Sequence, residues 1–265
     1  MAETRVNGVR IHYRVRGEGD AVLMLPGSGM KADTYDFTQT PAFLEAGHSC
    51  VLADLRGTEP SECPESEYMV QDMATDMARL VEELGFGPVH LFGHSLGSWV
   101  GQELALAFPQ LVRSAVLCGT LANRGAFEDA LSRAYIELLE SGQALPPRYL
   151  ACVLMAQIYT ASELTDDDLV PLVIDAVVGD LHDDVQQWRA VEAYRDRLES
   201  LAAITVPCRI IGFEHDILCP AHLGRELAAA ISGADYVEVP GVAHAGPLSA
   251  PEVVNPLALD WFSRH

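Results

Sequence analysis

Residues 91–98 read L-F-G-H-S-L-G-S and place one serine between two glycines at the end of an apolar run. The run V-H-L-F at 89–92 has the composition of a buried strand, and L-G-S-W-V-G-Q-E-L-A-L-A-F at 96–108 reads as a helix. In a sharp strand-to-helix turn, side chains larger than those of Gly93 and Gly97 would collide with the strand and the helix. We therefore predict that Ser95 is a nucleophile held at the edge of a sheet. A purely structural turn residue is the alternative.

The segments on both sides of this turn predict an α/β fold. Residues 9–16 alternate apolar and polar side chains, as a half-buried strand at a sheet edge does. Apolar positions between 70 and 84 recur every three or four residues, which indicates a helix. The order of strands and helices predicts a mostly parallel central sheet covered by helices on both faces. The runs predicted as further strands are 21–25, 49–53, 114–118, 208–213 and 234–239, and a last helix starts near Pro251.

Between Gly119 and Val206 the alternation of strands and helices stops. This stretch contains segments with helical patterns, namely 126–140, 146–159 and 184–198. It is too long for an ordinary connection, so we predict an all-helical cap inserted after the sixth strand. The expected organisation is an α/β core formed by residues 1–120 and 201–265, with the cap at 121–200 as an insert of the same domain.

The charge and the cysteine content of the sequence indicate which partners, metal sites and cellular compartments to expect. There are 17 Lys and Arg residues against 38 Asp and Glu residues, a net charge of −21. This charge disfavours phosphate backbones and anionic lipid surfaces, so neither nucleic acid nor membrane is an expected partner. The six cysteines form no C-x-x-C pair and no zinc-type spacing, which is typical of thiols in a reducing compartment. The first residues lack the apolar core of a secretory signal, and the apolar stretch at 149–159 is too short for a membrane span. We expect a cytoplasmic protein without a metal or organic cofactor.

A serine nucleophile requires a base, and His244 is the best placed of the histidines. It lies in V-E-V-P-G-V-A-H-A-G-P-L, a Gly- and Pro-rich loop directly after the last predicted strand. A loop at the carboxyl edge of the sheet can reach the serine turn. His215 and His222 are the next candidates.

The base in turn requires an acid that orients it, and Asp216 is the favoured residue. It follows the predicted strand C-R-I-I-G-F in the sequence G-F-E-H-D, again at the carboxyl edge. Glu214 is two residues away and is one alternative. An acid placed after the strand that ends near Cys118 is the other.

These residues and several flanking motifs resemble the α/β-hydrolase superfamily, in the capped, single-domain branch that includes esterases, lactonases, C–C hydrolases and haloperoxidase-like enzymes. The chain order Ser95, Asp216, His244 is the order of the catalytic triad in this superfamily. The resemblance extends from about residue 8 to residue 263. The matching motifs are P-G-S-G at 26–29, D-L-R-G at 54–57, G-H-S-L-G at 93–97, A-L-A-F-P-Q-L-V at 105–112, G-F-E-H-D at 212–216 and G-V-A-H at 241–244, followed by P-E-V-V-N.

The resemblance implies an oxyanion hole formed by the backbone N–H groups of Ser28 and Leu96, the residue after the nucleophile. Two positions depart from the family pattern. Pro26 replaces the usual histidine, and Glu59 occupies a position where relatives commonly have glycine. The first change affects the anchoring of the loop, and the second puts a carboxylate near the pocket or on its rim.

The sequence thus predicts a serine hydrolase that cleaves an ester, lactone or thioester of an apolar small molecule through an acyl-enzyme. One alternative is a lyase, cyclase, acyltransferase or perhydrolase of small-molecule metabolism with the same triad, and another is a hydrolase-like ligand receptor with little turnover. A small-molecule substrate is the expected partner, and a homodimer is left open. For the cap aromatics, helix packing is favoured and substrate contact is the alternative. The candidate substrate contacts are Gly27, Gly29, Met30, His94, Tyr149, Tyr159 and Trp188.

Overall fold

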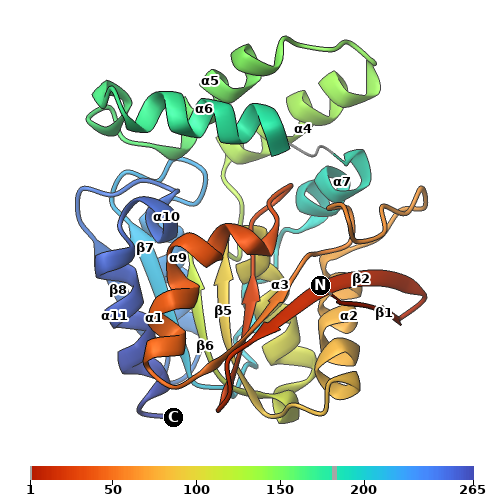
Figure 1. Ribbon diagram of the computed structural model, residues 1–265, viewed down its shortest axis with the longest axis vertical. Helices are drawn as coiled ribbons and strands as arrows, with labels where there is room; N and C mark the ends of the chain where they lie inside the picture. Colours follow the sequence, from red (N-terminus) through yellow and green to blue (C-terminus); the bar gives the residue numbers. More distant parts are fainter. Residues whose placement is uncertain (1, 181–183) are drawn as a thin grey trace.

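The computed structural model describes residues 2–180 and 184–265, and its centre is an eight-stranded sheet (Figure 1). The strand order is β1-β2-β4-β3-β5-β6-β7-β8. The pairs β1–β2 and β2–β4 are antiparallel, and every other neighbouring pair is parallel. The predicted α/β fold with a mostly parallel sheet is therefore confirmed. The strands are β1 (Ala2–Val6), β2 (Val9–Arg16), β3 (Ala21–Leu25), β4 (Ser49–Ala53), β5 (Val89–His94), β6 (Val112–Cys118), β7 (Cys208–Phe213) and β8 (Asp235–Val239).

The N-terminal edge of the sheet differs from the prediction. Strand β1 was not predicted, and it pairs with β2, so β2 is the second strand and not the edge. A tight turn connects the two strands, with Asn7 at φ 47° and Gly8 at φ 82°. Asn-Gly is a strong hairpin signal, because both turn residues need positive φ. The residues of β1 are mostly exposed, so the strand has no apolar run that would reveal it.

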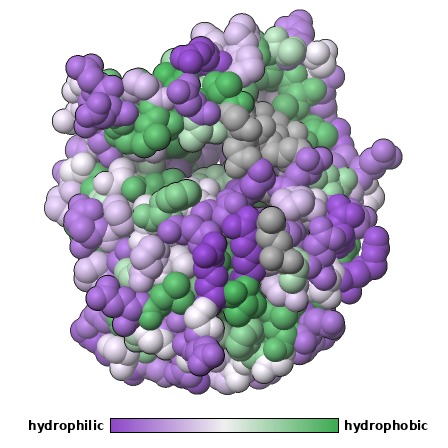
Figure 2. All heavy atoms as spheres, in the orientation of Figure 1, coloured by the Kyte–Doolittle hydropathy of each residue, from purple (hydrophilic) through white to green (hydrophobic). Residues whose placement is uncertain are grey.

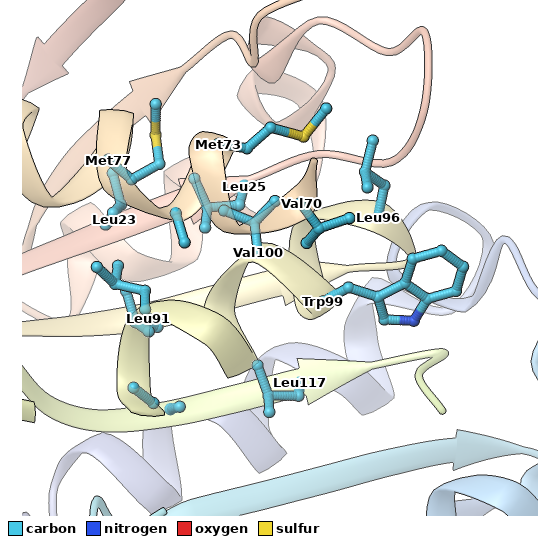
Figure 3. Close-up of a cluster of buried hydrophobic side chains, with 14 of the residues drawn as sticks. Leu23, Leu25, Val70, Met73, Met77, Leu91, Leu96, Trp99, Val100 and Leu117 are labelled. Atoms are coloured by element: carbon cyan, nitrogen blue, oxygen red, sulfur yellow. The ribbon is translucent and has the colours of Figure 1, made fainter. Parts of the chain in front are cut away.

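Helices cover both faces of the sheet because successive strand residues point to opposite sides. In β3, Leu23 and Leu25 belong to the core cluster under α2 and α3, whereas Val22 and Met24 belong to the cluster under α1 and α11. Figure 3 shows the first cluster, where leucines of β3, β5 and β6 meet side chains of α2 and α3. On the first face lie α2 (Val70–Glu83), α3 (Leu96–Ala107), α8 (Leu198–Leu201) and α9 (Ala221–Ala230); the second face is covered by η1 (Ala32–Phe37), α1 (Gln39–Glu45) and α11 (Pro251–Phe262).

The insert after β6 is helical and lies beyond one end of the sheet (Figure 1). Its elements are α4 (Ala126–Glu140), α5 (Pro147–Ile158), η3 (Glu163–Thr165), α6 (Leu169–Asp180) and α7 (Val185–Ala193). Helices α4, α5 and α7 lie where the sequence predicts helices, although α7 ends at Ala193 and not at 198. Helix α6 was not predicted, because its sequence is almost uniformly apolar and shows no helical period. Residues 1 and 181–183 of the predicted core and cap lie outside the described residues, and the division into core and cap stays a prediction.

The surface of the helical insert carries apolar side chains. In Figure 2, hydrophobic residues gather on the insert above a hollow between it and the part of the molecule that contains the sheet. Exposed apolar residues of the insert include Phe127, Tyr149 and Leu172. None of the helices within residues 2–180 and 184–265 is both long and apolar enough to cross a membrane.

Candidate active site

Ser95 occupies a strained turn between β5 and α3. Its backbone has φ 54° and ψ −122°, a conformation that a residue with a side chain adopts at a cost of roughly 1–3 kcal/mol. The Ser95 N–H donates to the carbonyl of Cys118 at the end of β6 (3.0 Å), and the N–H groups of Ser98 and Trp99 donate to the Ser95 carbonyl. These bonds hold the serine at the carboxyl ends of β5 and β6.

The two glycines of the turn allow the backbones to approach closely. A Cβ atom on Gly93 would lie 2.7 Å from the carbonyl oxygen of Gly97 and 2.8 Å from the Cα atom of Ser98. A Cβ atom on Gly97 would overlap the carbonyl group of Leu25 and would lie 2.6 Å from that of Pro26. The predicted collisions with strand and helix are therefore confirmed, and Gly97 sets the distance between α3 and the loop after β3.

We expect Gly97→Ala to destabilise the protein by about 3 kcal/mol, because rigid backbone must move to accept the new methyl group. Gly101→Ala is the matched control in the same helix. Its Cβ atom would meet side-chain carbons, Leu117 Cδ2 at 3.0 Å and Leu91 Cδ1 at 3.8 Å, which can shift. The higher helix propensity of alanine offsets part of that cost. Urea unfolding measures both variants, and equal stabilities for the two would contradict the proposed constraint.

His244 and Asp216 form a buried pair at the same edge of the sheet. The Nδ1 atom of His244 lies 2.7 Å from Oδ2 of Asp216, and both residues are about 95% buried. The other carboxylate oxygen, Oδ1, accepts the backbone N–H groups of Leu218 (2.8 Å) and Cys219 (2.7 Å). Burial alone raises the pKa of Asp216, but the charge and hydrogen bond of His244 and the two N–H groups together lower the pKa below its ordinary value. Asp216 therefore remains a carboxylate that fixes the imidazole ring.

The His244 ring lies beside the residues that anchor Ser95. A Cβ atom on Gly119, the residue after Cys118, would lie 3.3 Å from Nδ1 and Cε1 of His244, so this position has no space for a side chain. His94 lies on the other side, with ring centroids 4.9 Å apart, and its Nε2–H donates to the His244 carbonyl (2.8 Å). Burial and the neighbouring His244 lower the pKa of His94 to about 3. A neutral His94 thus holds the backbone of His244 next to the serine turn.

The rival residues are placed less favourably. The side chain of His215 is 55% exposed, and His222 is exposed at the start of α9. Glu214 is exposed and accepts the N–H of Gly241 (2.7 Å) instead of contacting His244. The positions directly after β6 hold Gly119 and Thr120, neither of which is an acid. The geometry therefore favours His244 and Asp216 over every alternative that the sequence left open.

The loop after β3, with its predicted N–H donor Ser28, is held by a residue of the insert. Gln187 in α7 is 1% exposed, and its Oε1 accepts the N–H of Gly29 (2.8 Å). Its Nε2 donates to the carbonyl of Arg56 (2.9 Å) and to Thr58 Oγ1 (3.1 Å). Gln187 was not predicted as a site residue, because a polar residue in an amphipathic helix is typical of a solvated face. The other predicted donor, Leu96, is the first residue of α3, where N–H groups lack intrahelical acceptors.

A cavity of about 330 Å³ opens between the serine turn and the insert. Ser28, Ser95, Tyr149 and Trp188 lie in its lining. Gly27, Gly29, Met30, His94 and Tyr159 were also predicted as substrate contacts but do not line it. His94 binds the His244 carbonyl, and Tyr159 packs with Met155 and Ala245. Glu59 is exposed and does not reach the cavity.

Cys219 adds a thiol to the buried histidine and carboxylate. Potential ligand atoms of Asp216, Cys219 and His244 lie within 4.8 Å of one another, which is close enough for a shared metal ion. Asp216 and His244 are, however, hydrogen-bonded to each other. Burial, followed by the charge of Asp216, raises the pKa of Cys219 well above its ordinary value, so the thiol stays protonated. The chemistry of these groups favours a histidine base with its acid over a metal centre.

Comparison with known proteins identifies the family of this chain. The Alpha/beta hydrolase family matches residues 22–257. The chain belongs to this family. Ser95 follows β5, Asp216 follows β7 and His244 follows β8, which is the chain order of serine, acid and histidine in the α/β-hydrolase triad.

Relatives within the α/β-hydrolase family are similar over nearly their whole length. "Putative non-heme bromoperoxidase BpoC" of Mycobacterium tuberculosis is 32% identical over 96% of this chain and 98% of its own. "Putative carbamate hydrolase RutD" of Azorhizobium caulinodans is 30% identical over 95% of this chain and 94% of its own. The crystal structure of the Mycobacterium tuberculosis H37Rv protein superimposes with a TM-score of 0.89, at 32% identity and 96% coverage of both chains. The names of these relatives refer to different reactions. Membership of the family therefore indicates the fold and a hydrolase, but it does not identify the substrate.

Proposed function

We propose that this protein is a serine hydrolase that cleaves an ester, lactone or thioester through an acyl-enzyme. The observation that carries the proposal is the buried His244–Asp216 hydrogen bond of 2.7 Å beside a serine in a strained turn. A structural turn residue would need neither the pair nor the strain. The family membership supports a hydrolase, and the apolar lining of the cavity supports an apolar substrate.

In the first half of the reaction, Ser95 Oγ attacks the substrate carbonyl carbon, and Nε2 of His244 takes the hydroxyl proton. The carboxylate of Asp216 accepts Nδ1–H, which leaves Nε2 free as the base and stabilises the imidazolium that forms. The N–H groups of Ser28 and Leu96 would donate to the oxyanion. The imidazolium then returns its proton to the leaving alcohol or thiol, and the acyl group remains on Ser95.

In the second half, His244 removes a proton from water, and the resulting hydroxide attacks the acyl-enzyme carbonyl. Collapse of the second tetrahedral intermediate breaks the ester bond to Ser95, the imidazolium protonates Oγ, and the carboxylic acid leaves. Because Gln187 holds the N–H of Gly29, the helical insert fixes the loop that carries the Ser28 donor during both halves.

The cavity favours an apolar acyl or alcohol chain. Most of its lining side chains are aliphatic or aromatic, as is usual for small-molecule sites. The aliphatic residues are Leu121, Leu131, Ala134, Leu138, Leu145, Leu150, Val153, Leu154, Val191 and Leu218.

The test is hydrolysis of a panel of p-nitrophenyl esters, thioesters and lactones, combined with intact mass after exposure to a fluorophosphonate. We expect a single covalent adduct on the wild type and turnover of at least one apolar acyl substrate. Folded protein that forms no adduct and releases no product would contradict the proposal. A ligand-dependent rise in Tm without product would then favour a receptor.

A second candidate, perhydrolysis, is favoured by the name of the bromoperoxidase relative. Hydrogen peroxide can replace water as the nucleophile that attacks the acyl-enzyme, and the product is then a peracid. Peracid formation that requires both peroxide and Ser95 would distinguish this reaction from hydrolysis.

A further inference from the structure

The cavity contains a carboxylate that the proposed reaction does not use. Glu128, in the first turn of α4, lines the cavity and is only 8% exposed. Its carboxylate lies over Gly125, with its carbon 3.4 Å from the position of a Cβ atom there. Across residues 2–180 and 184–265, this carboxylate takes part in no hydrogen bond or ion pair. A largely buried carboxylate without a protein partner can accept a hydrogen bond from a molecule in the cavity.

The nearby guanidinium of Arg124 is already committed to other groups. Its Nε donates to Asp129 Oδ1 (2.9 Å), and its Nη1 donates to the Val191 carbonyl (2.8 Å). Its Nη2 donates to the backbone carbonyl of Glu128 (2.7 Å) and to Ser132 Oγ. Asp129, and not Glu128, is therefore the charge partner of Arg124. Asp129 also pairs with Arg195 (Nη1–Oδ2, 3.6 Å), so Glu128 is the carboxylate of this group that has no ion pair among the described residues.

The position of Glu128 in helix α4 suits an acidic side chain but does not occupy its carboxylate oxygens. Glu128 is the third residue of α4, where the helix dipole stabilises an acidic side chain. In a capping box, the carboxylate would also accept the N–H of the residue before the helix. That residue is Gly125, and no side chain caps this end of α4. The oxygens of Glu128 therefore stay available to a molecule in the cavity.

The carboxylate lies toward the candidate triad and is accompanied by aromatic rings. Its charge contributes to the raised pKa of Cys219, after burial and Asp216, and Cys219 lies beside His244. Tyr149 lines the same cavity, and so do Tyr135 and Trp188, whose ring centroids are 4.5 Å apart. Aromatic faces and a carboxylate around an apolar space are the groups that bind ammonium ions in proteins.

We propose that Glu128, with the aromatic rings of the cavity, binds a protonated amine on the substrate, so that the natural substrate is an ester or related acyl compound with an apolar chain and an ammonium group. This inference rests on the proposed serine-hydrolase function and adds a substrate class to it. The net charge of −21 also favours a cation over a neutral or anionic ligand.

The test uses p-nitrophenyl ω-aminoalkanoates of about six to ten carbons, each paired with the alkanoate in which a methyl group replaces the ammonium. At one chain length, the wild type should prefer the amino ester in kcat/KM by about tenfold or more. Glu128→Gln should remove this preference and leave kcat/KM for the alkanoate within about twofold, since glutamine is also suited to this helix position. Glu137→Gln is the matched control, because Glu137 is exposed on the same helix and does not line the cavity.

Turnover of the alkanoates without a preference for any amino ester would overturn the inference alone, whereas failure of all esters would overturn the proposed hydrolase function. Equal effects of Glu128→Gln and Glu137→Gln would also overturn the inference. They would indicate that the negative charge of the whole protein attracts the amino ester, and not a binding site at Glu128. Hexylammonium chloride gives a readout without catalysis. It should raise the Tm of the wild type more than hexanol does, and Glu128→Gln should abolish the difference; no difference in the wild type would count against the site.

Discussion

Ser95→Ala is expected to abolish the fluorophosphonate adduct and to lower kcat for any hydrolysed ester by about 10⁶-fold, as loss of the nucleophile does in other triad enzymes. The reason is that the adduct and the acyl-enzyme both form on Ser95 Oγ. The exchange removes one hydroxyl and keeps the Cβ atom that already occupies the turn at φ 54°. Circular dichroism should therefore match the wild type, and intact mass together with ester turnover measures the loss.

Ser98→Ala is the control for this variant. Ser98 lies three residues further along the same helix, and its hydroxyl donates to the Ser95 carbonyl (2.6 Å). Its removal should cost about 1 kcal/mol of stability and leave labelling intact. An adduct that persists on Ser95→Ala, or one that is lost on Ser98→Ala alone, would show that the reactive serine has been assigned wrongly.

The sequence predicts most of the fold because the decisive signals are local. Buried strands such as β3 and β7 are nearly continuous apolar runs, although β7 contains Arg209, and the serine turn contains the glycines that it needs. Strand β1 was not predicted, because an exposed edge strand needs no apolar run. The Asn7-Gly8 turn nevertheless marks its end. Helix α6 was not predicted because its sequence is almost uniformly apolar and shows no helical period; Pro171 lies in its first turn, where proline does not break a helix. Tertiary contacts determine the structure of such segments, and these contacts cannot be read from the periodicity of the sequence.

Part of the candidate site could likewise be predicted from local sequence signals, and part of it could not. Ser95, Asp216 and His244 each follow a strand or precede a helix, so their positions at the carboxyl edge could be predicted from neighbouring residues. Gln187 and Glu128 lie on helices of the insert, where the neighbouring residues do not reveal their roles. The hydrogen bond of Gln187, for example, is to Gly29, which is 158 residues away in the chain. A helical pattern separates polar from apolar faces but cannot distinguish a polar face in water from one against a buried loop.

Asp216→Asn is expected to lower kcat/KM by about 10⁴-fold while the protein stays folded. The hydrogen bonds of Asp216 determine this outcome. Its Oδ1 accepts two backbone N–H groups, from Leu218 and Cys219, so the single oxygen of an asparagine must take that place. The amide NH₂ then faces Nδ1 of His244 and donates to it. The imidazole proton moves to Nε2, which can no longer accept the proton of Ser95.

Glu214→Gln supplies the matched control, because it removes a carboxylate two residues away in the same loop. The Glu214 side chain is exposed, and its Oε2 accepts the Gly241 N–H (2.7 Å), a bond that the glutamine oxygen can replace. We expect kcat/KM within about twofold of the wild type, since an exposed charge is screened by solvent. Steady-state kinetics on one ester decides between the two carboxylates. A large loss in Glu214→Gln with an active Asp216→Asn would transfer the acid role to Glu214, and the buried pair would then be structural.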